Sequence, residues 1–301
     1  MITFLSGGTG TPKLLQGARK ILKDSDISVV VNTGEDIWYQ GGHISPDVDT
    51  VMFLFAGILN AKTWWGIEGD SFITHDTIVE YLPDAYMAIG DKDRAIHLVR
   101  AELLKSGMNL TEVTDIFCQK LGITARVCPM SDDPWTTHVR TEEGDVHFQE
   151  YWVKHRGRLP ITEVIHYPEK APDATRSALE SIIKADIVVI GPSNPVTSIL
   201  PILSCNGIRD ELKKKKVVAI SPFIGDEPVS GPAGELMKTI GHPAGSAGVY
   251  AMYQDIVTHF IQDIRDPAAV SGAVRCDTLM KSPDIAAGLM GEILSLTGSG
   301  E

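Results

Sequence analysis

The sequence is poor in basic residues and has no long apolar run. Lysine and arginine total 27 against 39 aspartates and glutamates, so the formal net charge is −12. A chain this acidic lacks the broad basic surface that nucleic acid or an anionic membrane requires, and we expect neither partner. No apolar run reaches the roughly 20 residues of a membrane span, and no signal peptide precedes the first predicted strand. We therefore expect a soluble, cytoplasmic protein.

Cysteine is also scarce, which excludes some kinds of small stabilised fold. The chain has 4 cysteines, and no two are close enough for a zinc knuckle or a redox C-x-x-C pair. We expect them to be small apolar residues in a reducing compartment. With 301 residues and 43% hydrophobic composition, the chain can build a core without disulfides or a structural metal.

The N-terminus predicts a strand, a glycine turn and a helix. Ile2 to Leu5 is an apolar run of strand length, and the helix is expected from Pro12 to Lys23. Between them lies a turn whose backbone N–H groups can face an anion at the helix end, made of Ser6, Gly7, Gly8, Thr9, Gly10 and Thr11. Lys13 replaces the third glycine of the dinucleotide motif, and no P-loop is present. A tight turn without a ligand remains the alternative.

A second buried strand, Ile27 to Val31, ends in Asn32, Thr33, Gly34, Glu35 and Asp36. Ligand sites of parallel sheets collect at such strand ends, so this loop should lie beside the first turn. A dehydrogenase would need an acid directly after this strand. Because Asn32 stands there, the sequence disfavours a NAD(P)-dependent oxidoreductase.

The loop that follows concentrates polar residues. It contains His43, Asp47 and Asp49, and a helix is expected from Val51 to Leu59 with Asp49 or Thr50 as its cap. Carboxylates at this spacing can bind Mg²⁺ together with phosphate oxygens. One of them can instead act as a general base toward a hydroxyl. The alternative is that both acids only cap and turn the chain.

Residues 60–122 interrupt the alternation of strands and helices. They predict a mainly helical insertion that covers the strand ends. Trp64 and Trp65 lie near its start, and helices are expected over residues 91–104 and 109–121. The first of these helices has apolar residues at positions 95, 96, 98, 99 and 103. Lys92 and Arg94 stand at its start, where cations reinforce an anion site unless they face solvent.

The second half returns to alternating strands and helices. Residues 136–140 and 146–149 predict a hairpin, and strands are expected over residues 123–127, 161–167, 186–190, 217–221, 257–261 and 273–276. The strand at 186–190 leads into a second glycine turn before a helix, made of Gly191, Pro192, Ser193 and Asn194. Two such turns favour a ligand with several phosphates. The pattern predicts an α/β protein with a mainly parallel sheet, in which residues 1–59 and 123–301 form the core.

Five of these loops together resemble the 2-phospho-L-lactate transferase family, and most closely its members from methanogenic archaea. The likeness runs in order along nearly the whole chain and rests on the segments at residues 6–10, 32–36, 45–50, 89–93 and 191–195. The resemblance implies a Rossmann-like three-layer core, a homodimer, and a role in the synthesis of the deazaflavin coenzyme F-420.

The resemblance also implies a reaction and a set of ligands. A 2-phospholactyl group would pass from a guanosine-diphosphate-linked donor to the ribityl hydroxyl of a deazariboflavin acceptor, releasing GMP, with Mg²⁺ required. By carry-over, Asp49 and Lys92 would contact the acceptor, and the two glycine turns would hold the GDP portion with Lys13 and Asn32 beside them. We also predict acceptor contacts from Asp36 and His43, and Mg²⁺ on Asp47 and Asp49. Asp49, with Asp47, would act on the acceptor hydroxyl.

Two further interpretations stay open. Bacterial proteins with a similar glycine turn bind nucleotide sugars and act as regulators, and a regulator of that kind would bind ligand without turnover. The sequence also leaves open whether the three-carbon unit of the donor is phospholactate or phosphoenolpyruvate, since these differ at one carbon.

Overall fold

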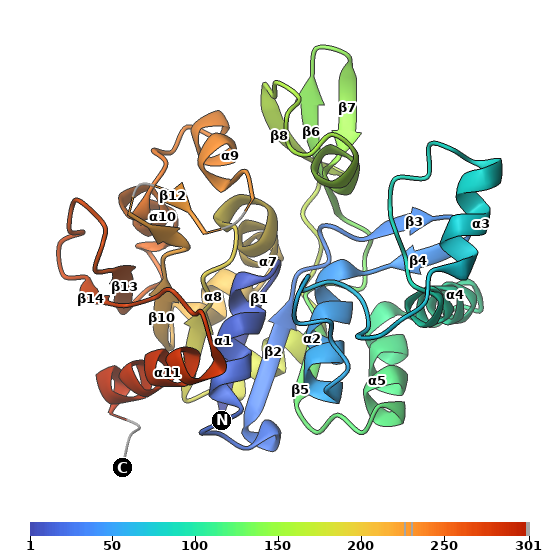
Figure 1. Ribbon diagram of the computed structural model, residues 1–301. Coiled ribbons are helices and arrows are strands. Elements are labelled where there is room, and N and C mark those ends of the chain that lie inside the picture. The colour runs from blue at the N-terminus through green and yellow to red at the C-terminus, as the bar shows by residue number, and fades with distance from the viewer. Residues whose placement is uncertain (226, 230, 299–301) are drawn as a thin grey trace.

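The computed structural model describes residues 1–225, 227–229 and 231–298. Its centre is a seven-stranded sheet of order β14-β13-β10-β9-β1-β2-β5, in which every neighbouring pair is parallel (Figure 1). Its strands are β1 (Ile2–Ser6), β2 (Ile27–Val31), β5 (Arg126–Pro129), β9 (Ile187–Ile190), β10 (Lys216–Ile220), β13 (His259–Asp263) and β14 (Val274–Cys276). The predicted α/β class with a mainly parallel sheet is confirmed.

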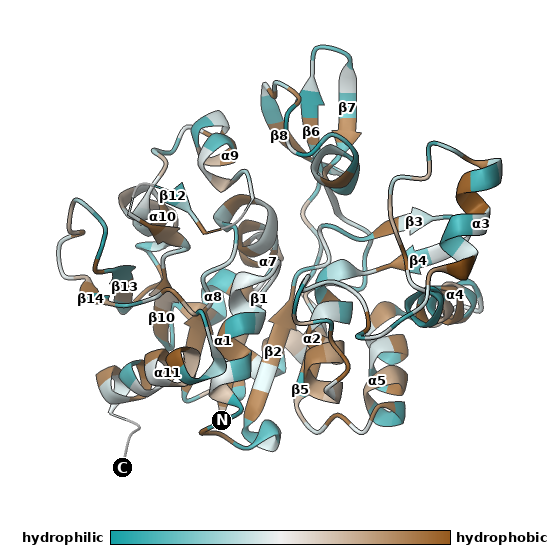
Figure 2. Ribbon diagram, in the orientation of Figure 1, coloured by the Kyte–Doolittle hydropathy of each residue, from teal (hydrophilic) through white to brown (hydrophobic). Residues whose placement is uncertain are grey.

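The sheet is buried on both faces because its central strands are almost continuously apolar (Figure 2). Successive residues pack into different cores. Leu5, Val30 and Val188 belong to one apolar cluster, and Phe4 and Val29 belong to the other. Helices cover each face, which gives three layers.

One face of the sheet is covered mainly by α1 (Gly10–Ala18), α2 (Pro46–Ala56), α5 (Leu110–Lys120) and α11 (Pro283–Thr297). The other face is covered by α6 (Arg176–Lys184), η3 (Pro195–Ile199), α7 (Leu200–Ser204), α8 (Ile208–Leu212), α9 (Ala233–Thr239) and α10 (Ser246–Tyr253). A single 3₁₀ turn, η1 (Asp24–Asp26), precedes β2.

Two helices have different bounds from those predicted. α1 ends at Ala18 rather than Lys23, and Arg19 after it donates to Asp24 and to the carbonyl oxygen of Leu54. α2 begins at Pro46, not at Val51. Proline suits this first position because its missing N–H would have no helical partner there. Asp47 and Asp49 therefore lie inside the first turn of α2, and neither caps it.

The insertion contains α3 (Ile73–Tyr81) and α4 (Asp91–Lys105), with α5 beyond them. The hairpin of β3 (Ile37–Tyr39) and β4 (Gly42–Ile44) lies against α4. Contact is close there: a Cβ on Gly42 would lie 2.9 Å from the Cβ of His97. Asn109 caps α5 and forms a capping box with Glu112.

The predicted hairpin at residues 136–149 is confirmed, and it is part of a small antiparallel sheet that projects beyond the main one (Figure 1). Its strands are β6 (Thr136–Thr141), β7 (Gly144–His147) and β8 (Glu163–Tyr167), with the π-helical turn η2 (Glu150–Lys154) between the last two. A short antiparallel pair also joins β11 (Phe223–Ile224) to β12 (Glu227–Pro228).

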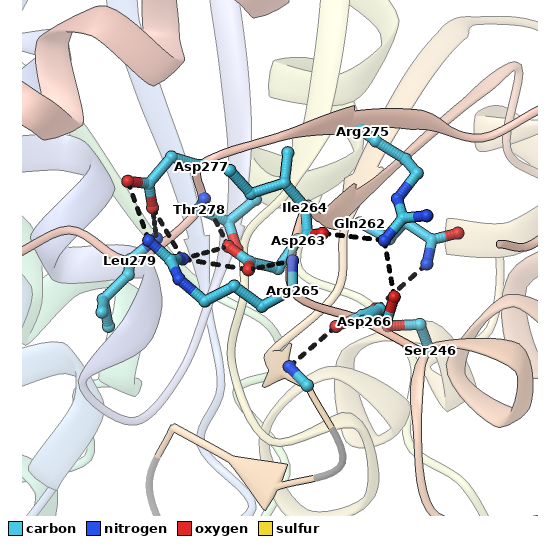
Figure 3. Close-up of polar contacts among 11 residues, drawn as sticks. Ser246, Gln262, Asp263, Ile264, Arg265, Asp266, Arg275, Asp277, Thr278 and Leu279 are labelled. Carbon is cyan, nitrogen blue, oxygen red and sulfur yellow. Dashed lines mark hydrogen bonds and ion pairs between the residues drawn. The ribbon is translucent and has the colours of Figure 1, made fainter. Parts of the chain in front are cut away.

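Buried carboxylates fix the loops beyond the last two strands of the main sheet (Figure 3). Asp263 accepts from Arg265 and from the backbone N–H of Thr278 at 2.8 Å. Asp266 accepts from Gln262 at 3.1 Å, from the backbone N–H of Gly225 at 2.9 Å, and from the Ser246 hydroxyl. Each acid meets several donors from different segments, so the network holds this end of the sheet together.

Candidate functional site

The two predicted glycine turns lie side by side and interlock. A Cβ on Gly10 would lie 1.8 Å from the carbonyl oxygen of Pro192, and one on Gly191 would lie 2.0 Å from Oγ1 of Thr11. The Ser193 hydroxyl contacts both the Thr11 hydroxyl, at 2.6 Å, and the Gly7 carbonyl oxygen. Glycine is therefore required at these two positions because the turns contact each other there. The approach of a phosphate group is not needed to explain them.

Gly8 and Thr9 form the part of the first turn that faces a cavity. Gly8 has φ +54°, a left-handed conformation that glycine adopts without strain. Its N–H donates to Asp47, whereas the N–H groups of Thr9 and Gly10 have no hydrogen-bond partner among the described residues. These two free donors stand at the N-terminus of α1, the kind of position at which proteins commonly bind anions.

Asp47 joins the first turn of α2 to both strand-end loops. Its Oδ1 accepts from Gly8 N at 2.7 Å, and its Oδ2 accepts from Asn32 Nδ2 at 2.8 Å. Asn32 also donates to the carbonyl oxygen of Thr197 at 3.1 Å. Burial raises the pKa of Asp47 to about 6. Asn32 therefore holds the Asp47 carboxylate in place. In a dehydrogenase, an acid at this strand end would bind the ribose of the cofactor instead.

The cavity beside this turn has a volume of about 410 Å³ and extends under the insertion. Its walls include Gly8, Thr9, Glu35, Asp47, Trp64, Trp65, Tyr86, Met87, Gln149 and Trp152. Glu35 is buried and accepts from Gln149 Nε2 at 2.6 Å. Burial and the Asp47 charge raise its pKa well above the ordinary value. The cavity therefore has a carboxylate floor and aromatic walls.

Trp64 is held in an uncommon conformation at this cavity. It has φ +56°, while its N–H donates to the Asn60 carbonyl oxygen at 2.8 Å. The ammonium group of Lys13 lies 5.5 Å from the centroid of its ring, and burial lowers the pKa of Lys13. A left-handed tryptophan costs free energy, and such strain concentrates at functional sites.

Asp49 faces away from this cavity, toward α4. Arg100 donates to both of its carboxylate oxygens, through Nη1 to Oδ2 at 3.0 Å and through Nη2 to Oδ1. His97 Nε2 lies 3.3 Å from Oδ2 of Asp49 and 3.1 Å from Oδ1 of Asp93. Burial raises the pKa of Asp49, but the Arg100 charge outweighs it and the pKa lies well below its ordinary value. Asp49 is therefore an ionised partner in a buried network.

Asp36 and His43 lie on the far side of the 33–36 loop, at a second cavity of about 390 Å³. His43 Nε2 is 3.9 Å from Oδ2 of Asp36, and Ser45 donates to Oδ1 of Asp36 at 2.7 Å. Burial raises the pKa of Asp36 well above its ordinary value and lowers that of His43 to about 4. Trp38, Trp135, His138 and His147 also line this cavity.

Lys92 lies apart from both cavities. Its side chain is exposed on the first turn of α4, and its backbone N–H donates to Oδ1 of Asp70 at 3.0 Å. Arg94 beside it is buried, and its guanidinium donates to Gln40 at 2.9 Å. Asn194 accepts from the N–H of Val196 at 3.0 Å and so caps η3.

The chain matches the family described as "2-phospho-L-lactate transferase CofD" over residues 2–281. The chain belongs to this family. A curated 2-phospho-L-lactate transferase of Methanospirillum hungatei is 66% identical to it, over 98% of this chain and 99% of the relative. Transferases of Methanocorpusculum labreanum and Methanocaldococcus jannaschii are 48% and 42% identical, and each alignment covers at least 98% of both chains.

Two solved structures of protein BH3568 from Bacillus halodurans, described as a member of the UPF0052 family, share the fold. One has a TM-score of 0.58 at 21% identity and covers 89% of this chain and 81% of that chain. The other has a TM-score of 0.56 at 19% identity. At these identities the likeness concerns the fold alone. Separately, no helix within the described ranges is long and apolar enough to span a bilayer.

The site of this CofD-family chain contains residues that the sequence did not single out. Glu35 comes from the loop after β2, whereas Gln149 and Trp152 come from the start of η2, and only the fold brings the two segments to one cavity. Asp93, His97 and Arg100 did have a signal, because positions i, i+4 and i+7 share one face of a helix. The polar spacing was obscured by the apolar residues between them.

Proposed function

We propose that this chain transfers a 2-phospholactyl group from lactyl diphosphoguanosine to the ribityl hydroxyl of 7,8-didemethyl-8-hydroxy-5-deazariboflavin, releasing GMP in coenzyme F-420 biosynthesis. The observation that carries the proposal is the cavity between the first glycine turn, at Gly8 and Thr9, and the insertion, in a chain that belongs to the CofD family. An anion-binding turn at one side and aromatic walls at the other suit a phosphorylated donor and a flat tricyclic acceptor.

The donor phosphates would lie at the free N–H groups of Thr9 and Gly10, with the N-terminus of α1 behind them. Lys13 is one turn along the same helix and supplies a nearby positive charge. The second turn, at residues 191–194, supports the first through Ser193. We propose that both turns together fix the diphosphate.

Mg²⁺ fits the acidic side of this cavity. Glu35 and Asp47 are buried there, and burial together with the charge of Asp47 raises the pKa of Glu35. Carboxylate oxygens are the ligands that Mg²⁺ prefers beside phosphates. We propose Asp47 as the ligand in this cavity, and the ion would neutralise charge on the phosphate oxygens. The further predicted ligand, Asp49, does not line this cavity and faces α4 instead.

The chain's own groups would position the acceptor and take up its proton. The acceptor hydroxyl oxygen attacks the phosphorus of the phospholactyl group, and the bond from that phosphorus to the bridging oxygen breaks, so GMP leaves with that oxygen. We propose that Glu35 accepts the hydroxyl proton, since it lines the cavity beside Asp47 and one of its oxygens is fixed by Gln149.

Contacts to the acceptor would come mainly from the insertion, which we propose as a covering unit over residues 60–122. Trp64, Trp65 and Tyr86 offer faces for stacking on the tricyclic ring. Contacts from Asp36, His43 and Lys92 stay predictions, because the first two line the second cavity and the third is exposed. Asp49 would act on the acceptor only by holding the first turn of α2 in place.

A transfer assay tests this function. Purified protein, Mg²⁺, deazariboflavin and lactyl diphosphoguanosine are mixed, and the products are separated with mass detection. A phospholactylated deazaflavin together with GMP, both lost on adding EDTA, is expected. Guanine-nucleotide binding without product would contradict the proposal for this donor. Product formed only from the enolpyruvyl analogue would mean that the three-carbon unit is phosphoenolpyruvate. An Asp49→Asn protein with full turnover would remove Asp49 from the reaction.

We also propose a homodimer, and exposed apolar side chains on the insertion support it. Ile73 and Tyr81 of α3 are 72% and 79% exposed, and Leu98 and Val99 of α4 are nearly half exposed. Exposed apolar groups of this size commonly mark an interface. Light scattering during gel filtration should give twice the chain mass, and Tyr81→Glu should shift it toward the single chain.

A further inference from the structure

A small cavity lies between α2 and α4 and adjoins the 410 Å³ cavity, with which it shares Pro46, Thr50 and Trp65. Its volume is about 10 Å³, and its lining includes Asp49, Asp93, His97, Pro46, Thr50 and Trp65. A space of this size holds one water molecule or one ion. Asp49, Asp93 and His97 each offer one ligand atom there, and these three atoms lie within 4.8 Å of one another.

The distances between these atoms suit a shared cation. His97 Nε2 is 3.1 Å from Oδ1 of Asp93 and 3.3 Å from Oδ2 of Asp49. Ligand bonds of roughly 2.1 Å at angles between about 90° and 109° place neighbouring ligand atoms roughly 3.0 to 3.4 Å apart. The geometry at His97 therefore matches two edges of a coordination shell.

A proton on His97 does not satisfy both carboxylates. One N–H group points in one direction, and Oδ1 of Asp93 has no hydrogen-bond partner within the described part of the chain, although His97 is 3.1 Å away. Asp93 is only 3% exposed, so water does not reach this oxygen freely. An unpaired carboxylate oxygen at this depth is costly, and it is aimed at the small cavity.

The chemistry of the three side chains also suits a metal ion. The donor set contains an imidazole nitrogen beside two carboxylate oxygens. Imidazole suits zinc and related metals, whereas Mg²⁺ prefers oxygen ligands throughout. The cluster thus differs in chemistry from the carboxylates Glu35 and Asp47 at the phosphate turn.

We propose that Asp49, Asp93 and His97 bind one Zn²⁺ ion between α2 and α4. The ion has three protein ligands and fills the small cavity. Arg100 keeps its contacts to both oxygens of Asp49. The role of the ion is structural: it fixes the insertion helix to the first turn of α2, which carries Asp47.

Zinc binding by the full-length chain tests the proposal without any substrate. Protein stripped with EDTA is incubated with Zn²⁺ alone, desalted and analysed for metal by mass spectrometry. One Zn²⁺ per chain is expected for the wild type, together with a higher melting temperature in the presence of Zn²⁺. In Asp93→Asn and His97→Ala, affinity should fall on the order of tenfold or more, and the thermal shift should disappear.

Asp76→Asn is the matched control, because Asp76 is an exposed acid on α3 and the substitution makes the same chemical change. It should keep the stoichiometry of the wild type. If His97→Ala fails to fold by circular dichroism, Asp93→Asn decides, since asparagine preserves the side-chain shape. Equal zinc in the wild type and in Asp93→Asn would overturn the proposal, as would a wild type that retains none.

Discussion

Arg100 of α4 and Asp49 of α2 form an ion pair that is almost completely buried, with side-chain exposures of 0% and 6%. The pair joins the insertion to the core, and Arg100 also donates to the His43 carbonyl oxygen at 3.0 Å. One guanidinium thus connects α4, α2 and the end of β3–β4. A charge pair at this depth makes the position of one partner dependent on the other.

Replacing Arg100 by methionine should strongly destabilise the protein. The substitution keeps much of the volume but leaves the Asp49 carboxylate buried without its main partner, which costs about 3–5 kcal/mol. Urea unfolding followed by circular dichroism should show this loss in the free energy of unfolding. Arg176→Met is the control, because the Arg176 side chain is 93% exposed in its pair with Glu180. Its expected cost is about 0–1 kcal/mol, and equal losses in the two variants would contradict the interpretation.

Stability should also fall in mild acid because of His147. Its Nε2 donates to the Asp36 carbonyl oxygen at 3.1 Å, and its Nδ1 accepts from the Gln149 N–H at 3.1 Å. Burial, with the neighbouring charge of His138, lowers its pKa to about 4. The unfolded chain takes up the proton near pH 6.5, whereas the folded chain resists it. The contribution is therefore complete above about pH 6.5 and is lost as the pH falls toward 4.

The measurement compares unfolding free energies at pH 7 and pH 5. The His147 contribution should fall by about 2 kcal/mol over this range, since each unit is worth about 1.36 kcal/mol. Glutamine in place of His147 provides both a donor and an acceptor but does not titrate, so His147→Gln should show a shallower pH dependence. An identical dependence in the two proteins would mean that His147 is not the titrating group.

The sheet is well predicted by the sequence, because buried parallel strands consist of short runs of β-branched residues. Ile27 to Val31 and the strand near Ile187 are examples, and each is followed by the expected polar loop. The contact between the two glycine turns was also predictable, since parallel strands place their carboxyl ends at one edge. The start of α2 is harder to predict, because proline is common in loops as well as at the first position of a helix, and here Pro46 opens the helix.

α4 shows why the rest of the site could not be predicted. Its apolar positions suggested a buried apolar face, yet Leu98 and Val99 are exposed while Asp93, His97 and Arg100 are buried. Burial of such groups is favourable only when each finds a partner, and those partners come from α2. Helical periodicity identifies a face, but it does not say whether that face meets an apolar neighbour or a carboxylate.

The interlocked turns should tolerate no side chain at Gly10. An alanine Cβ there would lie 1.8 Å from the Pro192 carbonyl oxygen, so the two turns must separate. We expect Gly10→Ala to lower the free energy of unfolding by several kcal/mol, as overpacking does, and to weaken binding of a guanine nucleotide. Thermal unfolding and calorimetry would measure these two effects.

Gly288→Ala is the matched control for this substitution. Gly288 lies within the helix α11, and no atom lies within 4 Å of the position that a Cβ would occupy. Alanine is a better helix former than glycine, so this variant should gain about 0.5–1 kcal/mol. A Gly10→Ala protein as stable as the wild type would show that the turns do not need their close contact.

Trp64 offers a substitution that should weaken binding of the acceptor far more than it lowers stability. Its φ of +56° suits glycine, so Trp64→Gly should relieve backbone strain of about 1 kcal/mol while removing the ring from the cavity wall. If the ring stacks on the acceptor, KM for deazariboflavin should rise roughly tenfold, the equivalent of about 1.4 kcal/mol. The melting temperature should fall little, because the relieved strain offsets the lost packing.

Trp38→Ala is the control, because it removes a ring from the second cavity instead and should leave KM unchanged. A larger effect on KM from Trp38 than from Trp64 would place the acceptor ring in the second cavity, beside Asp36 and His43.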